Sequence, residues 1–584
     1  MTSTKFQNLS VWINSNFQSR EPGTITKTIS KLFQKLNIKF YFFKYIFIFL
    51  SFLFFFSCGD MRKNESKLTV FKYNEAAGIT SLDPAFAKDQ SNIWACNQLF
   101  SGLIQLNDKL EVEPCIAKHW EISDDGLYYT FYLRNDVYFH DNQVFKNRKV
   151  TAYDFEYSFN RIIDTKIVSP GVWVFNNVEQ KNGTYSFKAL NDTVFTINLR
   201  QPFPPFLSIL SMQYCSVVPK EAIEHYGKDF RKFPIGTGPF KFKMWKEGVK
   251  LVFVKNHKYF EKSGMERLPY LDAVAITFLI DKQSAFLEFV KGKLDFMSGI
   301  DASYKDELLT KRGHLNPKYQ NKIKLITQPY LNTEYLGILV DTNLPLVRKN
   351  PLRLKAVRQA VNYGFDRKKM MKFLRNNIGT PGNYGIVPLG LPSFDSSRKQ
   401  VYDYNPDLAR KLLFDAGFPN GEGLPPITLS TTADYLDLCK YIQHQLSEIG
   451  IMIKIDVNPP AALKELKAQA KLNFFRASWI ADYPDAENYL SLFYSKNFCP
   501  EGPNYTHFSN YGFDKLYELS RLEENDSIRY DLYRYMDDMI MQEAPVVVLY
   551  YDQVLRFVQK NIDGLTGNPI NLLTLKKVKK IDGN

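Results

Sequence analysis

The chain has few of the residues on which metal and covalent chemistry depend. Its 584 residues include seven histidines and six cysteines. No two histidines stand four residues apart, and the sequence has neither an H-E-x-x-H nor a C-x-x-C motif. These spacings are typical of zinc sites and thiol redox pairs, so we expect no metal site and no cofactor.

The signatures of common hydrolases and nucleotide-binding enzymes are missing as well. The sequence has no G-x-S-x-G elbow and no G-x-x-x-x-G-K-[ST] loop. A catalytic triad can be dispersed along a chain, so an exported hydrolase remains an alternative, which turnover of a peptide would support. We expect a binding protein without catalytic residues.

Composition is that of a globular protein, with 45% hydrophobic and 23% charged residues. A chain of this length is expected to bury more than one core. The net charge of +14 is uneven, because residues 1–57 hold seven basic residues and one acidic residue, which leaves +8 for the remainder. That excess is spread along the chain, so nucleic-acid binding has no specific support.

The N-terminal segment predicts export. Residues 40–56 form an apolar run interrupted by Lys44 and closed by Ser57-Cys58-Gly59. The run is short of the roughly 20 apolar residues of a comfortable membrane span, and lysines precede it, as in a signal segment. The small residue before cysteine resembles a bacterial lipobox, so Cys58 is the expected lipidation site, and an uncleaved anchor is the alternative. The other five cysteines are odd in number, and we expect buried thiols with no assignable disulfide.

The stretch 473–490 combines charge and aromatic surface. Residues 473–479 predict a buried strand that ends at Tyr483-Pro484, since proline cannot donate to a sheet. A helix is expected to start at Ala486, with Asp485 as its cap. Arg476, Trp479 and Asp482 would then stand at the end of a strand, where binding pockets are common.

The chemistry of this stretch suits a ligand with two charged ends. The carboxylate of Asp482 can pair with an ammonium group, and the planar fork of Arg476 matches a carboxylate. Trp479 and Tyr483 are candidate pocket walls. The alternatives are structural: Asp482 as a turn residue, the two aromatic rings as core, and Arg476 as the partner of a protein acid.

A series of motifs resembles the extracytoplasmic oligopeptide- and dipeptide-binding proteins of ABC importers, that is, family 5 of the solute-binding proteins. The motifs follow one another in the order of that family from about Leu68 to about Gly564. They are Ser-Leu-Asp-Pro at 81–84, Glu-Pro-Cys-Ile-Ala-Lys-His-Trp at 113–120, Pro-Ile-Gly-Thr-Gly-Pro-Phe at 234–240, Arg-Gln-Ala-Val-Asn-Tyr at 358–363, the Trp-x-x-Asp-Tyr run at 479–483 and Glu-Ala-Pro-Val-Val-Val at 543–548.

The resemblance implies a two-lobed α/β fold of the type II periplasmic-binding-protein class with an additional subdomain. It implies a monomer that binds short peptides and passes them to a permease, with Asp482 at the peptide's amino terminus and Arg476 near its carboxyl end. The alternatives are another solute, such as a nickel complex, haem, a cell-wall peptide or a sugar, or a receptor or chaperone that senses peptides without transport.

Domain boundaries follow from the same resemblance. Lobe I is expected to be discontinuous, and lobe II to be one stretch of chain. The expected segments are 1–57 as signal or anchor, 58–65 as spacer, 66–112 with 234–332 and 545–584 as lobe I, 113–233 as the extra subdomain, and 333–544 as lobe II.

Several other residues are predicted to have structural roles and not to bind a ligand. The Gly236-Thr-Gly238-Pro239 run predicts a tight turn into a strand at 240–245. Arg358 and Arg367 flank an apolar helical stripe, and the pattern favours a solvated face or local ion pairs over a ligand clamp.

Overall fold

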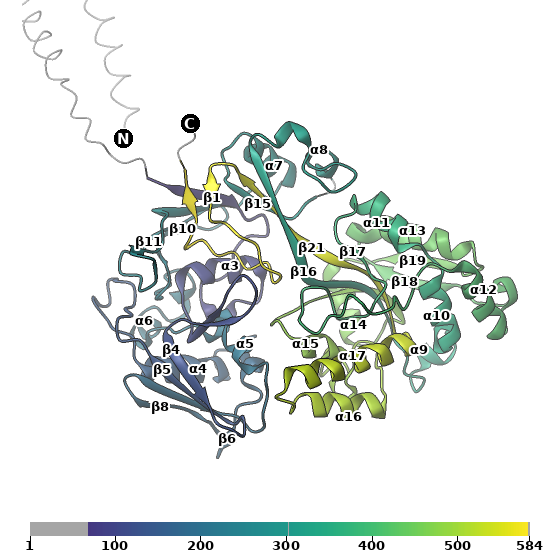
Figure 1. The fold of residues 1–584 in the computed structure, drawn as a ribbon, viewed down its shortest axis with the longest axis horizontal. Coiled ribbons are helices and arrows are strands. Elements are labelled where there is room, and N and C mark those ends of the chain that lie inside the picture. Colours follow the sequence, from purple (N-terminus) through teal and green to yellow (C-terminus); the bar gives the residue numbers. More distant parts are fainter. Residues whose placement is uncertain (1–67, 302, 582–584) are drawn as a thin grey trace, which may run out of the picture. The chain divides into compact units, whose positions relative to one another are not determined.

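The structure, a computed structural model, describes residues 68–301 and 303–581 (Figure 1). The apolar run at 40–56 and Cys58 lie outside the described residues, so export and lipidation stay predictions. Within the described ranges, no helix combines the length and the apolarity needed to cross a membrane. The five cysteines of this part of the chain are all buried free thiols, as expected.

One mixed sheet dominates the described residues, with strands contributed by segments far apart in the sequence. Its 11 strands run in the order β10-β11-β14-β1-β15-β21-β16-β20-β18-β19, and β17 pairs with β21. The strands are β1 (Val70–Asn74), β10 (Phe240–Lys246), β11 (Lys250–Lys255), β14 (Ala273–Thr277), β15 (Phe296–Ser298), β16 (Ile323–Ile338), β17 (Thr380–Pro381), β18 (Ile427–Thr431), β19 (Ile453–Val457), β20 (Phe474–Ile480) and β21 (Val546–Gln559).

Strands β16 and β21 are the two long strands that join the two ends of this sheet (Figure 1). Near Ile323 the antiparallel pair adjoins β15, and near Ile338 it adjoins β20. The register shifts between Pro329 and Thr333, where the pairing is interrupted. A β-bulge bends and twists a strand, so the sheet changes direction at this point.

A second sheet is antiparallel and lies entirely within residues 117–198. Its order is β4-β5-β9-β8, with β4 (Ala117–Ile122), β5 (Tyr128–Leu133), β8 (Phe187–Asn191) and β9 (Val194–Asn198). Helix α4 (Ala152–Ile163) packs on it through Phe155 and Phe159, which contact Phe195. The Asp154 carboxylate accepts from the Thr151 N–H at 2.8 Å and fixes the start of this helix.

Short two-stranded ribbons complete the strands. They are β2 (Ile104–Leu106) with β3 (Val112–Pro114), β6 (Gln180–Lys181) with β7 (Thr184–Tyr185), β12 (Lys262–Ser263) with β13 (Glu266–Arg267), and β22 (Ile562–Asp563) with β23 (Lys579–Lys580).

Five of the other helices begin at a polar cap. The carboxylate or amide oxygens of Asp281, Asp366, Asn405, Asn510 and Asn525 accept from backbone N–H groups in the first turn of α7, α11, α12, α16 and α17. The remaining helices are α3 (Gln90–Leu99), α5 (Phe206–Leu210), α6 (Lys220–Tyr226), α7 (Lys282–Val290), α8 (Lys305–Leu308), α9 (Pro345–Arg348), α10 (Lys355–Tyr363), α11 (Arg367–Arg375), α12 (Pro406–Asp415), α13 (Leu436–Ser447), α14 (Pro460–Ala468), α15 (Glu487–Leu490), α16 (Tyr511–Ser520) and α17 (Asp526–Glu543).

Buried apolar residues gather in separate clusters that follow the chain. One cluster draws on residues 71–296 and 558–578, whereas two others draw on residues 331–551. Tyr483 is an exception, because it packs in the first cluster while its neighbours Ala481 and Ala486 belong to the second. Its ring centroid lies 6.2 Å from that of Trp173.

The predicted turn at Gly236-Thr-Gly238-Pro239 packs closely against the C-terminal end of α3. A Cβ on Gly236 would lie 2.1 Å from the Leu99 carbonyl oxygen, and one on Gly238 would lie 2.5 Å from the Leu99 carbonyl carbon. Only glycine permits that approach, and β10 begins directly after it. The turn therefore fixes the C-terminal end of α3.

Arg358 and Arg367 do not form a solvated face, whereas the alternative of a local ion pair is met at Arg358, whose guanidinium lies 3.9 Å from the Glu543 carboxylate. Both are buried, with 6% and 2% of their surface exposed. Arg358 donates to the Glu543 carbonyl, and Arg367 donates to the Val548 carbonyl at 2.6 Å. Each guanidinium thus satisfies backbone carbonyls near the junction of α17 and β21, which a helical pattern could not reveal.

Candidate functional site

The first cavity, of about 440 Å³, lies between segments from both ends of the chain and the end of β20. Helix α3 and the following turn supply one wall, and the C-terminal segment 564–577 supplies another. The end of β20 contributes Ile480, Ala481 and Asp482, and β16 contributes Tyr330. Four regions distant in sequence therefore converge on one space.

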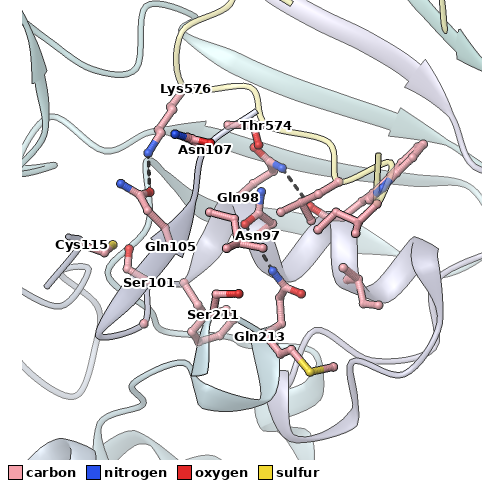
Figure 2. A pocket seen from close by; sticks show the side chains of 18 of the residues that line it. Asn97, Gln98, Ser101, Gln105, Asn107, Cys115, Ser211, Gln213, Thr574 and Lys576 are labelled. Atoms are coloured by element: carbon pink, nitrogen blue, oxygen red, sulfur yellow. Dashed lines mark hydrogen bonds between the residues drawn. The ribbon is translucent and has the colours of Figure 1, made fainter. Parts of the chain in front are cut away.

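Side-chain amides make up much of one wall (Figure 2). Asn97 donates to the Leu573 carbonyl at 2.9 Å, and Gln213 donates to the Asn97 amide oxygen at 3.4 Å. Lys576 donates to Gln105 at 2.7 Å on the other side. Because each amide has both donors and acceptors, such a wall can bind the backbone of an extended peptide in many registers.

Asp482 is the sequence-predicted residue that the structure brings to this cavity. Its backbone N–H donates to the Asn488 amide oxygen at 3.2 Å, and the Trp479 indole N–H donates to the same oxygen at 2.8 Å. Asn488 is buried and thereby holds the end of β20 in place. Asp482 forms no ion pair among the described residues.

The electrostatics of Asp482 favour a cationic partner. Asp482 is exposed to solvent at the cavity, although many protein atoms lie around its carboxylate. Burial raises the pKa of this carboxyl, and a hydrogen bond with Asn488 lowers it in part. An ammonium group in the cavity would relieve the cost of keeping this carboxylate ionised.

Trp479 and Tyr483 support the strand end and are not among the residues that line the cavity. Trp479 is half-buried and packs against the cluster formed by residues 331–551. The Tyr483 hydroxyl donates to the Glu487 carboxylate, and 6% of the residue is exposed. Both rings position their neighbours through hydrogen bonds to protein groups.

Arg476 has a protein acid as its partner. It donates to the Glu334 carboxylate, and its guanidinium carbon lies 3.4 Å from the centroid of the Tyr435 ring. The exposed fractions of the Arg476 and Glu334 side chains are 14% and 4%. Burial raises the pKa of Glu334, and the charge of Arg476 opposes this rise. Arg476 is not among the residues that line the first cavity.

A second ion pair extends this arrangement across the sheet. Arg375 donates to Asp552 at 2.7 Å and to the Tyr550 hydroxyl at 3.0 Å. The Asn332 amide donates to Glu334 at 3.2 Å and to Asp552 at 3.4 Å. The positive charges of Arg476 and Arg375 therefore compensate the negative charges of Glu334 and Asp552.

Asp485 has a structural role, but not as the cap that the sequence predicted. Helix α15 starts at Glu487, one residue later than expected, and its N-cap is Ala486, which makes no side-chain cap hydrogen bond. The Asp485 carboxylate accepts from the Glu487 N–H at 2.8 Å and holds the turn just before the helix. Helix α15 ends at Leu490, and a 3₁₀ turn, Ser491–Phe493, follows. Burial raises the pKa of Asp485 to about 6, and Arg529, 3.7 Å away, lowers it in part.

The α3 wall was missed at the level of sequence. Gln90, Trp94 and Asn97 lie at helical spacing on one face and reach the cavity together. Polar residues at that spacing were the available signal, but they are also typical of a solvated helix face. Their placement depends on the chain's other end, since the Trp94 indole donates to the Asn571 carbonyl at 2.8 Å.

Comparison with solved structures defines the class of the fold. A Helicobacter pylori periplasmic binding protein, DppA, in complex with the peptide STSA, is 25% identical with a TM-score of 0.71, and covers 88% of this chain and 98% of its own. The Escherichia coli murein tripeptide binding protein MppA is 21% identical with a TM-score of 0.71, over 89% and 99%. The fold is the α/β fold of type II periplasmic binding proteins, as expected.

Sequence comparison then gives the family. The glutathione-binding protein GsiB of Escherichia coli (strain K12) is 26% identical over 494 residues, which cover 84% of this chain and 90% of that protein. Residues 111–498, more than half of the chain, match the description "Bacterial extracellular solute-binding proteins, family 5 Middle". The chain belongs to this family, whose members bind solutes for ABC importers.

Proposed function

We propose that this protein captures short peptides in the first cavity, outside the cytoplasmic membrane, and delivers them to an ABC permease. Cys58 would carry the lipid that anchors it. The single observation that carries the peptide assignment is Asp482, a carboxylate in a cavity walled by amides that has no ion-pair partner among the described residues. A free amino terminus supplies the missing charge, and a peptide backbone matches the amide wall.

The carboxyl end of the peptide has two proposed partners. Lys88 lines the first cavity, and a lysine can pair with a carboxylate as a point charge. Arg476 is the other proposed partner, on the family resemblance. To serve a ligand it would share its guanidinium with Glu334. Trp479 and Tyr483 are proposed to hold Asp482 in position rather than to touch the peptide.

We also propose that two lobes close around the ligand. Lobe I would comprise 66–112, 234–332 and 545–584, with 113–233 as its subdomain, and lobe II would comprise 333–544. The interruption in β16 between Pro329 and Thr333 supports a hinge there, because the two lobes would be joined through β16 and β21. A ligand that touches both lobes binds the closed state better, and that difference shifts the population.

The test is Asp482→Asn, measured by calorimetry with a tripeptide and its N-acetylated form. The free-amino peptide should lose about 10-fold or more in affinity, or about 1.4 kcal/mol, because its ammonium loses an ion pair. The acetylated peptide has no ammonium, so its affinity should change little. Equal losses for both peptides would contradict the role of Asp482.

Two controls sharpen this test. Asp108 also lines the first cavity, but it lies in the turn between β2 and β3 and not at the end of β20, so Asp108→Asn should leave the difference between the two peptides intact. Glutathione serves as a second ligand because it has a free amino group and two carboxylates. If glutathione binds and unmodified tripeptides do not, the proposed substrate class is wrong.

A further inference from the structure

A second chamber, of about 350 Å³, adjoins the first cavity. The two spaces share Gln90, Trp94 and Tyr330 in their walls. A ligand that lies against these shared residues therefore has access to both. The second chamber is nearer to the ends of β1 and β15 and to the start of α7.

Most charges of the second chamber are compensated within the protein. Asp301 pairs with Lys282 at 2.8 Å, and both line the chamber. Asp552 pairs with Arg375 at 2.7 Å. Because these two pairs are neutral, the net charge of the second chamber depends on Glu75, its remaining acidic wall residue.

Glu75 has neither an ion pair nor a side-chain hydrogen-bond partner among the described side chains. It directly follows β1, and its backbone is held on both sides: its N–H donates to the Thr277 carbonyl at 2.9 Å, and its carbonyl accepts from Gly78 at 3.1 Å. Burial raises its pKa to about 7, and a hydrogen bond from the Ala77 backbone opposes this. A fixed backbone thus presents a half-buried carboxylate to the second chamber.

The other walls suit a long apolar stem with a charged end. Trp94, Phe296, Tyr304, Tyr330 and Leu555 contribute aromatic and aliphatic surface. Lysine and arginine side chains pack their methylene groups along such surface while the charged head reaches a polar partner. Aromatic faces also attract cations.

We propose that the second chamber is a subsite for a cationic ligand side chain, such as lysine or arginine, with Glu75 as its counter-ion. The inference rests on the proposed peptide-binding function and narrows its substrate class. The chamber is net negative while Glu75 is ionised, so an ammonium or guanidinium group completes the charge balance. An acidic side chain would add a second uncompensated negative charge beside Glu75.

A lysine scan tests the subsite. Lysine, norleucine or glutamate is placed at each position of trialanine, and affinities are measured by calorimetry. At one position lysine should bind about 10-fold more tightly than norleucine, which has a similar stem without the charge, and glutamate should bind worst. Binding of the series without any lysine preference would overturn the subsite but leave the proposed function standing. No binding by any peptide would overturn both.

The variant Glu75→Gln tests the counter-ion. It should abolish the preference for lysine over norleucine and leave the norleucine affinity almost unchanged. Asp108→Asn removes a carboxylate from the first cavity only, so it should keep the preference. A preference that persists in Glu75→Gln would assign the cation to another group and overturn the role of Glu75.

Proton release in the unaltered protein is a second readout that needs no variant. With a pKa of about 7, Glu75 is partly protonated in the free protein near neutral pH. Binding a cation favours the ionised form, so the lysine peptide should release a proton and gain affinity between about pH 6 and about pH 8. Buffers of different ionisation enthalpy measure the release.

The norleucine peptide controls for other titrations. The α-amino group of any peptide titrates near pH 8, and it contributes equally to both ligands. Burial and the negative charge of Glu75 raise the pKa of the Tyr73 hydroxyl on β1. The other charged or titratable groups around the chamber are its wall residues Lys282, Asp301, Tyr304, Tyr330 and Asp552. Equal proton release by the lysine and norleucine peptides would overturn the proposed role of Glu75.

Discussion

Arg476 lies near the start of β20 and Asp482 follows its end, six residues later, and their charges have different surroundings. Arg476 is covered by the Tyr435 ring and paired with Glu334, while Asp482 lies in the first cavity without an ion-pair partner among the described residues. A charged residue near a cavity is thus a strong ligand candidate when the protein leaves its charge uncompensated. Glu75 meets that criterion as well.

The largest expected effect comes from breaking the compensated pair. Arg476→Met leaves Glu334 buried without its cation, so the free energy of unfolding should fall by about 3–5 kcal/mol in urea denaturation. The double variant Glu334→Gln with Arg476→Met should recover most of that loss. Lys464→Met, at an exposed position of α14, is the control and should change stability little.

The same variant tests the proposed ligand role of Arg476. If Arg476 only compensates Glu334, peptides with a free carboxyl end and C-amidated peptides should keep their affinity ratio in Arg476→Met. A selective loss for free-carboxyl peptides would show that Arg476 also binds the ligand and would break the contrast with Asp482.

A smaller effect is expected at Asn488, which holds the uncompensated carboxylate in place. Asn488→Ala removes the acceptor of the Trp479 indole N–H and of the Asp482 N–H. Stability should fall by about 1–3 kcal/mol, because a largely buried donor loses its partner. Free-amino peptides should also bind more weakly. The exposed Gln469→Ala serves as control, and unchanged stability and binding in Asn488→Ala would contradict the prediction.

The smallest effect is expected from Lys576→Met, which removes the cation that compensates Glu261. Lys576 pairs with Glu261 at 2.7 Å in the wall of the first cavity, with exposed fractions of 14% and 18%. Lys576→Met should cost about 1 kcal/mol of stability, since the pair is partly solvated. It should raise the affinity of lysine-containing peptides modestly, because Glu261 then lacks its cation.

Lys577 provides the matched control for that change. It lines the same cavity but is exposed and forms no ion pair among the described residues. Lys577→Met should therefore leave stability almost unchanged. If Lys576→Met and Lys577→Met change stability and peptide affinity equally, the ion pair between Lys576 and Glu261 has no measurable effect, and the prediction is wrong.

Local features were predictable because their causes are local. The strand expected at 473–479 is β20 at Phe474–Ile480, the Gly236-Thr-Gly238-Pro239 turn precedes β10, and a helix follows Asp485, starting one residue later than expected. Apolar runs, glycine and proline, and a short polar cap act over a few residues. The order of the motifs was enough to identify the family, which the comparisons confirm.

Long-range partners were not predictable from these patterns. The pattern around Arg358 and Arg367 was typical of a solvated helix face. In the structure both side chains are buried and donate hydrogen bonds to the backbone carbonyls of Glu543 and Val548. Glu75 carried no signal, because a single glutamate after a strand is ordinary. The chamber around it requires residues from β15, α7 and β21, which lie more than 200 positions further along the chain.

By itself, the sequence determined the family, the local elements and the chemistry of the Arg476–Asp482 stretch, since these depend on the order and type of neighbouring residues. Only the tertiary structure decided which of its charges was compensated. Glu334 lies on a different strand from Arg476, and the protein supplies no such partner to Asp482 among the described residues. Whether a charge is compensated depends on which residues lie close to it in space, and the order of residues along the chain does not show this.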